Sequence, residues 1–408
     1  MRTQKEFDLI NEIKNHFSSL GKDITASLVE AFASLVKTLQ ASQDERFVFL
    51  LVGRTGVGKS SVINALMAQE VAKVNPYEPE TMMVESYDSE IDDIRFTVID
   101  TPGLCDDIED AGNDRRYLEL IRSKVKRVDV MWFVSLLNDT RVRADEKRGI
   151  ELISKSFGSD IWEHSVIIFT FADKVDAIDY PVTLQKRTEL IRKEIAKYVG
   201  YEVANNIPSV AVGNNSEITP DGQTWLAKLY TKVFVRMSEK GTIPFLLATA
   251  RRINNGGENA SSISRNTERV NDDKTNSNSY QNTRKPNAYR LFSKVSKEKR
   301  NSRGYASNRE DQYYKSYNET SYETCKQPNK ADSSDNNGFN VRVEPVFEFN
   351  QHQREEIKDK MFKVAPILKS IGGAIGSIFG GFGKKIGQIA GGAVGHAVDF
   401  IGSLFGWF

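Results

Sequence analysis

The chain has 408 residues, of which 56 are basic and 55 acidic, and its net charge of +1 provides no global positive field. We therefore expect no nucleic-acid partner. The two cysteines, Cys105 and Cys325, exclude a disulfide framework or a zinc cluster and favour a reducing, cytoplasmic compartment. The sequence from Met1 to Glu6 lacks the apolar core of a secretory signal, so we expect no secretory leader.

The first predicted segment, residues 1–44, is helical. Apolar residues recur at helical spacing from Glu6 to Leu39, with a break near Gly21. An amphipathic helix buries its apolar face against another element. The segment could therefore cap the domain that follows or form a stalk with a partner, and the sequence does not choose between the two.

A complete phosphate-loop motif, G-x-x-x-x-G-K-[ST], runs from Gly53 to Ser60. The apolar run Phe47–Val52 before it is typical of a buried strand, and Ser61–Met67 after it is typical of a helix start. Glycines let backbone N–H groups converge on a phosphate at a helix N-terminus, where the helix dipole also favours negative charge. Lys59 would neutralise β- and γ-phosphate oxygens, and Ser60 would ligate Mg²⁺. The predicted nucleotide-binding residues of this loop are Gly53, Arg54, Thr55, Gly56, Val57, Gly58, Lys59, Ser60 and Ser61.

A second motif at a strand end completes the phosphate and metal side of the predicted site. The strand Ile94–Ile99 leads into Asp100-Thr-Pro-Gly103. Asp100 could hold the Mg²⁺ shell through water, and Gly103 could offer its N–H to the γ-phosphate. Thr81, in the loop between the two motifs, is the candidate hydroxyl that closes on Mg²⁺ when a triphosphate is bound. The predicted metal ligands are thus Ser60, Thr81 and Asp100.

Two later strands are expected to carry the base-binding loops. Ser165–Thr170 leads into Phe171-Ala-Asp173-Lys-Val-Asp176, and Pro208–Val212 leads into Gly213-Asn214-Asn215. A carboxylate can accept hydrogen bonds from N1–H and the 2-amino group of guanine, whereas adenine would leave it unpaired. Asp173 is the preferred guanine reader because it follows the strand more closely, and Asp176 is the alternative. Thr170, Asn214 and Asn215 are predicted to line the same site.

Helical periodicity between these strands predicts the covering layers of an α/β domain. The predicted helices should pack on both faces of a mostly parallel sheet. They are Asp114–Lys126, Asp145–Phe157, Thr183–Val199 and Thr224–Met237. The sequence thus predicts a three-layer P-loop GTPase domain over residues 45–250.

A further block runs from Val128 to Lys147 and continues with Ser156-Phe-Gly158 and Ile161-Trp162. Together with the phosphate loop, Asp-Thr-Pro-Gly-Leu and Phe-Thr-x-x-Asp pieces, it resembles the septin-related P-loop GTPases. Within these it is most similar to the plant avirulence-induced-gene (AIG), vertebrate GIMAP and chloroplast Toc receptor group. The resemblance covers roughly residues 45–240. It implies binding of GTP or GDP with Mg²⁺, slow hydrolysis, dimerisation with a second copy or a related GTPase across the nucleotide, and membrane attachment.

The resemblance also implies roles for particular residues. Arg141 matches a position where Toc-type receptors place an arginine toward the partner's nucleotide, although Arg143 could serve equally. The candidate catalytic residues are Lys59, Thr81 and Arg141.

The chain departs from the small-GTPase pattern at two positions. Leu104 stands where those enzymes keep a water-orienting glutamine, so we expect weak turnover unless a partner or second copy completes the site. Phe171 replaces the usual lysine of the base motif, and its ring could pack on the purine.

Beyond the G domain the composition changes twice. Residues 251–345 are rich in Asn, Ser and charge with few branched apolar residues, and we expect a disordered linker. Residues 346–408 form a third segment, and the stretch from 372 to 406 holds twelve of the chain's 28 glycines, many of them four residues apart. Small residues at this spacing let two helix backbones approach closely in lipid, while each costs helix stability in water.

Three interpretations of this glycine-rich tail remain open. The run Ile371–Gly383 is too short to span a bilayer, and Ile386–Phe408 is long enough but contains polar residues. The tail could be an anchor or glycine-zipper hairpin in a membrane, a segment on a membrane surface, or a packing element in water. Upstream lysines would keep the G domain on the cytosolic side.

The predicted function is therefore a cytosol-facing, slow GTPase that switches its assembly with the bound nucleotide at a membrane. Two alternatives stay open. One is a GTP-gated interaction protein with negligible hydrolysis. The other is a membrane-perturbing effector whose tail is controlled by the G domain.

Overall fold

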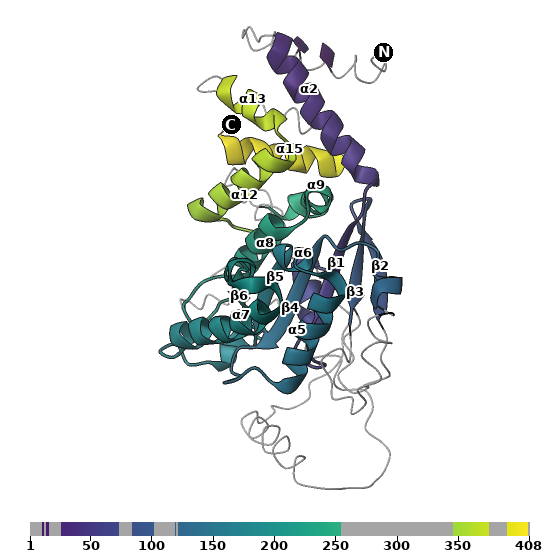
Figure 1. The fold of residues 1–408 in the computed structure, drawn as a ribbon. Helices are drawn as coiled ribbons and strands as arrows, with labels where there is room; N and C mark the ends of the chain where they lie inside the picture. Colours follow the sequence, from purple (N-terminus) through teal and green to yellow (C-terminus); the bar gives the residue numbers. More distant parts are fainter. Residues whose placement is uncertain are drawn as a thin grey trace, which may run out of the picture. The chain divides into compact units, whose positions relative to one another are not determined.

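The computed structural model describes residues 10–11, 14–15, 26–72, 84–101, 119, 121–253, 346–374 and 390–406. Within them, one sheet of six strands has the order β2-β3-β1-β4-β5-β6 (Figure 1). All neighbouring strands are parallel except β2 and β3. The strands are β1 (Phe47–Val52), β2 (Glu85–Ile91), β3 (Ile94–Asp100), β4 (Val130–Leu136), β5 (Ser165–Thr170) and β6 (Ser209–Ala211). The predicted α/β domain with a mostly parallel sheet is confirmed.

The central strands are mostly apolar because helices cover both of their faces. Every residue of β1 and β5 is buried, and both strands have the bounds predicted from the sequence. In the parallel register Leu51 of β1 lies beside Asp100 of β3, and Val52 lies beside Phe133 of β4. The strand ends of β1, β3 and β4 therefore meet at one edge of the sheet, where the loops after them can form a common site.

The edge strand β2 was not predicted, because its sequence is polar. Its residues are exposed or half-buried, and it forms an antiparallel hairpin with β3 through Asp92 and Asp93. These two residues have φ angles of +50° and +66°. Aspartate tolerates this left-handed region better than most residues, and a two-residue turn of this kind suits the twist of a hairpin.

Helices pack on both faces of the sheet. One face carries α5 (Ala144–Phe157), α6 (Asp160–Glu163) and α7 (Tyr180–Asn205), whose apolar residues join Leu50 and Phe133 in one core. The other face carries α3 (Lys59–Met67), α8 (Trp225–Arg236) and α9 (Glu239–Thr249), around Phe49 and Trp132. The predicted helices at 145–157, 183–199 and 224–237 are thus present with shifted ends. Of the predicted helix 114–126, residues 121–124 are helical, and 114–118 and 120 lie outside the described residues.

Helices from the two ends of the chain pack together beside α9. They are α2 (Ala26–Ala41), α12 (Gln351–Val364), α13 (Ile367–Ala374) and α15 (Gly392–Phe405). α2 contacts α13 and α15, α12 contacts α8, and α15 contacts α9 (Figure 1). Their apolar residues, including Phe32, Leu35, Met361 and Ile401, continue the core around α8 and α9. Across the described ranges, no helix combines the length and apolarity needed to cross a membrane.

A short segment ahead of α12 joins this helical group to the G domain. Phe347 and Phe349 pack against Tyr230 of α8 at tilted angles, with ring centroids 4.5 and 5.2 Å away. The guanidinium of Arg252, in the 3₁₀ helix η3 (Ala250–Arg252), lies 4.5 Å from the Phe347 ring. Arg252 also donates a hydrogen bond to the carbonyl of Leu66 at 2.5 Å, near the end of α3. The predicted linker was 251–345, but Arg251 and Arg252 belong to η3 and Ile253 forms a bridge with Phe347. Residues 254–345 lie outside the described residues.

Candidate functional site

The phosphate loop follows β1 and leads directly into α3, as the sequence predicts. A Cβ atom on Gly53 would lie 2.3 Å from the carbonyl oxygen of Val134, so no side chain fits where the loop leaves the sheet. Lys59 is 6% exposed, and its ammonium donates to the carbonyls of Gly53 and Arg54 at 3.0 and 3.1 Å. The lysine thus lies along the inside of its own loop, where an arriving phosphate would meet it.

Asp100 ends β3 beside this lysine, and the two groups form an ion pair with a 3.6 Å separation between Nζ and Oδ1. Burial raises the pKa of the Asp100 carboxyl, and the nearby Lys59 charge opposes the rise only in part. The Oδ1 atom is buried and accepts no hydrogen bond within the described part of the chain. A buried carboxylate oxygen without a hydrogen bond fits a place in a Mg²⁺ shell, because hard oxygen donors are the ligands that Mg²⁺ prefers.

The base-binding loops after β5 and β6 are joined by hydrogen bonds. The Asp173 carboxylate accepts from the main-chain N–H of Asn214 at 2.9 Å and from the Asn215 amide at 3.1 Å. Thr170 is fully buried and donates to the carbonyl of Ser135 at 3.2 Å. Asp173 is therefore bonded to Asn214 and Asn215, while Asp176 is exposed and its carbonyl accepts from residues that begin α7.

Phe171 adopts a left-handed conformation, with φ +55° and ψ +36°, which is uncommon for an aromatic residue. The ammonium of Lys174 lies 4.5 Å from the centroid of its ring. Strained backbone of this kind occurs where the surrounding structure holds it, and functional sites are common examples.

A buried network of charged side chains holds the backbone of the loop that carries Arg141 and Arg143, called the arginine loop here. Arg187 of α7 donates to the carbonyl of Arg141 at 2.7 Å, and its guanidinium pairs with Glu146 of α5 at 2.7 Å. Arg143 pairs with Asp139 at 2.8 Å within the same loop. The side chains of Arg141 and Arg143 are both exposed, so either could reach a partner.

An ion pair links this loop to the phosphate loop. The Nε atom of Arg54 lies 2.5 Å from Oδ2 of Asp145, and both side chains are largely buried. Burial raises the pKa of the Asp145 carboxyl, and the charge of Arg54 opposes that rise. The Arg54 side chain is therefore paired with the arginine loop and does not point into solvent.

The predicted residues Thr81 and Gly103, as well as Leu104, lie outside the described residues. Two contributors were missed by sequence reasoning. Arg187 and Glu146 look like ordinary helix-surface charges in the sequence, and only their burial in the fold distinguishes them. The one available signal was Glu146 at the third position of its helix, where its carboxylate accepts from the N–H of Arg143 at 3.0 Å.

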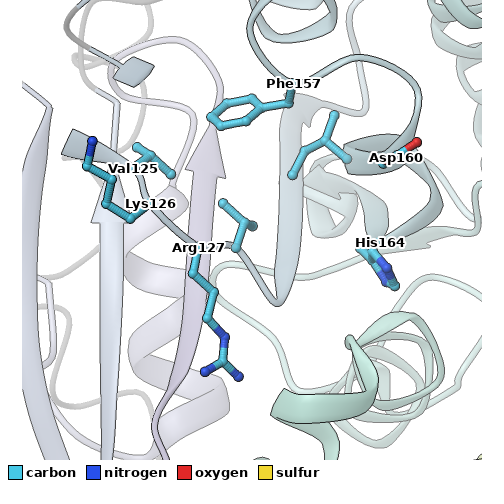
Figure 2. A pocket seen from close by; sticks show the side chains of 8 residues that line it. Val125, Lys126, Arg127, Phe157, Asp160 and His164 are labelled. Carbon is cyan, nitrogen blue, oxygen red and sulfur yellow. The ribbon is translucent and has the colours of Figure 1, made fainter. Parts of the chain in front are cut away.

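A pocket lies at the opposite edge of the sheet, beside the residues that precede β4 and β5. It has a volume of about 220 Å³ and includes Phe157, Ile161 and Val128 in its lining. Figure 2 shows the guanidinium of Arg127 turned away from Phe157, and this group pairs with Asp129 at 3.0 Å. The Nδ1 atom of His164 is engaged with the carbonyl of Arg236 at 2.9 Å. Arg127 and His164 are thus bonded to other parts of the fold. We therefore take the edge that carries the phosphate loop as the candidate site.

The strand, phosphate loop and helix, with a buried aspartate at the neighbouring strand end, define a P-loop G domain. Residues 48–209 match the family model described as the AIG1 family, so this part of the chain is similar to AIG1-family G domains.

Curated proteins similar to the chain include translocase of chloroplast proteins. The chain is 27% identical over 197 residues to translocase of chloroplast 33 of Arabidopsis thaliana, covering 44% of this chain and 65% of that protein. It is 29% identical over 226 residues to the translocase of chloroplast 34 homolog of Chlamydomonas reinhardtii, covering 49% and 56%. The chain thus spans less than two thirds of either relative.

Among solved structures, the chain is similar to Toc33 from Arabidopsis thaliana in complex with GDP and Mg²⁺. That match has 26% identity and a TM-score of 0.39, and it covers 51% of this chain and 90% of Toc33. A dimerization-deficient mutant of Toc33 matches with 24% identity and a TM-score of 0.41, covering 52% and 92%.

Proposed function

We propose that the G domain binds GTP and GDP with Mg²⁺, hydrolyses GTP slowly and switches its assembly with the bound nucleotide at a membrane surface. The observation that carries this proposal is the convergence of the phosphate loop, Asp100 and Asp173 at the carboxyl ends of parallel strands of one sheet. Nucleotides bind at this edge in open α/β sheets.

At the phosphate end, the loop N–H groups and Lys59 would bind the phosphates. Lys59 would exchange its present carbonyl partners, Gly53 and Arg54, for phosphate oxygens. Ser60 and Asp100 would hold Mg²⁺, with Thr81 as the further predicted ligand. The metal would neutralise charge on the β- and γ-phosphates.

At the base end, Asp173 is the proposed guanine reader. Its two oxygens accept hydrogen bonds from Asn214 and Asn215, which orient the carboxylate. Each oxygen can accept more than one hydrogen bond, so the group can still pair with N1–H and the 2-amino group of guanine. Adenine offers an acceptor at N1 and would meet the carboxylate unfavourably.

The base assignment is tested by measuring the affinity of labelled GTP and ATP for the wild type, Asp173→Ala and Asp176→Ala. We expect tight GTP binding, weak ATP binding and a loss of GTP affinity only in Asp173→Ala. A wild type that binds ATP as tightly as GTP would contradict the proposal. A loss confined to Asp176→Ala would transfer the role to that residue.

The proposed assembly is a dimer across the nucleotide, with Arg141 or Arg143 reaching the partner's site. Both are exposed on a loop whose backbone is fixed by Arg187. In the related chloroplast translocon components Toc33 and Toc159, dimerization is important for the GTPase activity. Single-turnover GTP cleavage at several protein concentrations tests this step. A rate that rises with concentration supports completion by a partner, and a negligible rate at every concentration supports the GTP-gated interaction protein.

The membrane role is proposed for the C-terminal segment. The apolar face of α15, including Val394, Val398 and Ile401, packs inside the protein, so a membrane-perturbing tail would first have to leave α2 and α9. Liposome leakage by the full chain, with GDP or a GTP analogue, tests this alternative against a chain that ends at residue 389. Equal leakage by both chains would exclude α15 as the active part.

A further inference from the structure

We propose that Asn214 is a positioning residue, which holds the base-reading carboxylate of Asp173 against the phosphate loop. From the sequence, Asn214 is predicted only to line the base site. The inference rests on the proposed guanine site and concerns how that site is assembled.

Asn214 bonds to the base loop at two points. Its side-chain oxygen accepts from the N–H of Phe171 at 2.9 Å, and its main-chain N–H donates to Oδ1 of Asp173 at 2.9 Å. The first bond uses the side chain and the second uses the backbone of the same residue. A shift of Asn214 would therefore move both ends of the Phe171–Asp173 turn.

The amide nitrogen of Asn214 lies directly on the phosphate loop. A Cβ atom on Gly58 would be 2.7 Å from the Asn214 Nδ2 atom and 3.6 Å from Cγ2 of Thr170. Gly58 has a φ of +91° and precedes Lys59, the first residue of α3. The same side chain thus contacts the loop that would bind phosphate and the loop that would bind the base.

The base loop needs this support because of its conformation. Phe171 has a φ of +55°, and a non-glycine residue keeps such a conformation only where its surroundings hold it. Its N–H is held by Asn214, and the N–H of the next residue, Ala172, donates to the carbonyl of Val212 at 3.0 Å. Both bonds come from the segment that follows β6.

Neighbouring polar residues do not share this role. The hydroxyl of Thr170 donates to Ser135 in β4, away from the base loop. Asn215 is exposed, and its amide donates to Oδ2 of Asp173 at 3.1 Å, whereas the three atoms nearest a Cβ on Gly58 belong to Asn214 and Thr170. Asn215→Ala is therefore a matched control, because it removes one bond to the same carboxylate and leaves the connection to the phosphate loop.

A double-mutant cycle on the full chain separates positioning from direct contact with the base. We expect Asn214→Ala to weaken GTP binding about tenfold when Asp173 is present, the effect of one well-formed hydrogen bond. In the Asp173→Ala background we expect less than about twofold, because the group that Asn214 positions is gone. Affinities are measured by competition with labelled GDP up to millimolar nucleotide. Equal losses in both backgrounds would overturn the proposal.

Hydrogen exchange of the Phe171 amide in nucleotide-free protein gives a readout that does not depend on binding. We expect this amide to lose protection in Asn214→Ala and to keep it in Asn215→Ala. Loss of protection in both variants, or in neither, would overturn the proposal. Asn214→Leu, which has a similar volume and no acceptor, replaces Asn214→Ala in both experiments if the alanine variant does not fold.

The two proposals fail in different ways. Wild-type protein that binds no guanine nucleotide refutes the proposed function, whatever the exchange experiment shows. Wild-type protein that binds GTP, with additive losses in the cycle, keeps the proposed function and refutes the role of Asn214.

Discussion

Arg187 and Glu146 form an ion pair in the interior of the G domain, with 2.7 Å between Nη2 and Oε1 and each residue no more than 3% exposed. Ser135 of β4 bonds to both partners, at 2.5 Å to Glu146 and 2.7 Å to Arg187. Arg187 also donates to the carbonyls of Leu136 and Arg141. Two helices, a strand and the arginine loop therefore depend on one buried pair.

Removing one partner of this pair should be costly. We expect Arg187→Met to lower the free energy of unfolding by roughly 3–5 kcal/mol, because Glu146 would remain buried without its counter-ion. The measurement is denaturant unfolding, with Lys186→Met on the exposed side of the same helix as the control. Arg187→Met combined with Glu146→Leu should recover much of the loss. A double variant no more stable than the single one would contradict this account.

Lys59 should dominate nucleotide affinity. We expect Lys59→Ala to weaken GDP and GTP binding about 100-fold, since it removes charge-assisted hydrogen bonds to phosphate. Titration with labelled nucleotide measures the change. Lys147→Ala, an exposed lysine of α5, is the control and should bind as the wild type does. A Lys59→Ala variant with unchanged affinity would mean that the nucleotide does not bind at this loop.

Asp100 should make stability depend on pH in a defined direction. Burial raises the pKa of this carboxyl above its ordinary value of 3.8, so the folded protein keeps the proton to a higher pH than the unfolded chain does. Stability from this group is present below 3.8 and is lost as pH rises through the folded pKa. Asp100→Asn should remove this decline in denaturant unfolding of the nucleotide-free protein. It should also weaken Mg²⁺-dependent GDP binding, and an unchanged metal requirement would argue against Asp100 as a ligand.

Lys360 of α12 should make the stability of the fold depend on pH in the opposite direction. Burial lowers the pKa of this ammonium to about 8, and it donates to the carbonyl of Met237 at 2.5 Å. Between about 8 and the ordinary value of 10.5 the folded state binds fewer protons than the unfolded chain. Stability should therefore rise with pH across that window. We expect Lys360→Met to flatten the rise in thermal unfolding, whereas a control at the exposed Lys147 of α5, Lys147→Met, should retain it.

The apolar side of α15 should contribute to folding stability. Ile401 is fully buried, so Ile401→Ala should lower the free energy of unfolding by roughly 2–4 kcal/mol through lost burial and a residual cavity. His396→Ala, on the exposed side of the same helix, should change it little. Denaturant unfolding of the full chain measures both. Equal stability of Ile401→Ala and the wild type would show that α15 does not stay on the protein in solution.

Local patterns were sufficient for β1, β5 and the phosphate loop of the G domain. β1 and β5 have the predicted bounds, because continuous apolar runs ending in a phosphate loop or a base motif are strong signals. β2 was missed because an edge strand needs no apolar pattern, and its pairing with β3 comes from the hairpin at Asp92 and Asp93. α9 was missed because Pro244 breaks the usual helix pattern, although the whole helix from Gly241 onward is buried.

For the tail, the sequence left three interpretations and the structure supplies packing partners. Glycine spacing alone suggests close helix contacts without saying whether lipid or protein provides the other surface. In the described residues, α15 contacts α2 and α9, which are far away in the sequence. No local pattern could have named those partners.

The sequence by itself determined the kind of chemistry, because a phosphate loop, a strand-end aspartate and a base motif depend on residue types at short, fixed spacings. Only the tertiary structure decided which distant side chains complete the site. Asn214 reaches Phe171 and Gly58, Arg187 reaches Glu146 and Arg141, and Arg54 reaches Asp145. These contacts join residues separated by 40 or more positions, and burial, which makes them strong, exists only after the chain has folded.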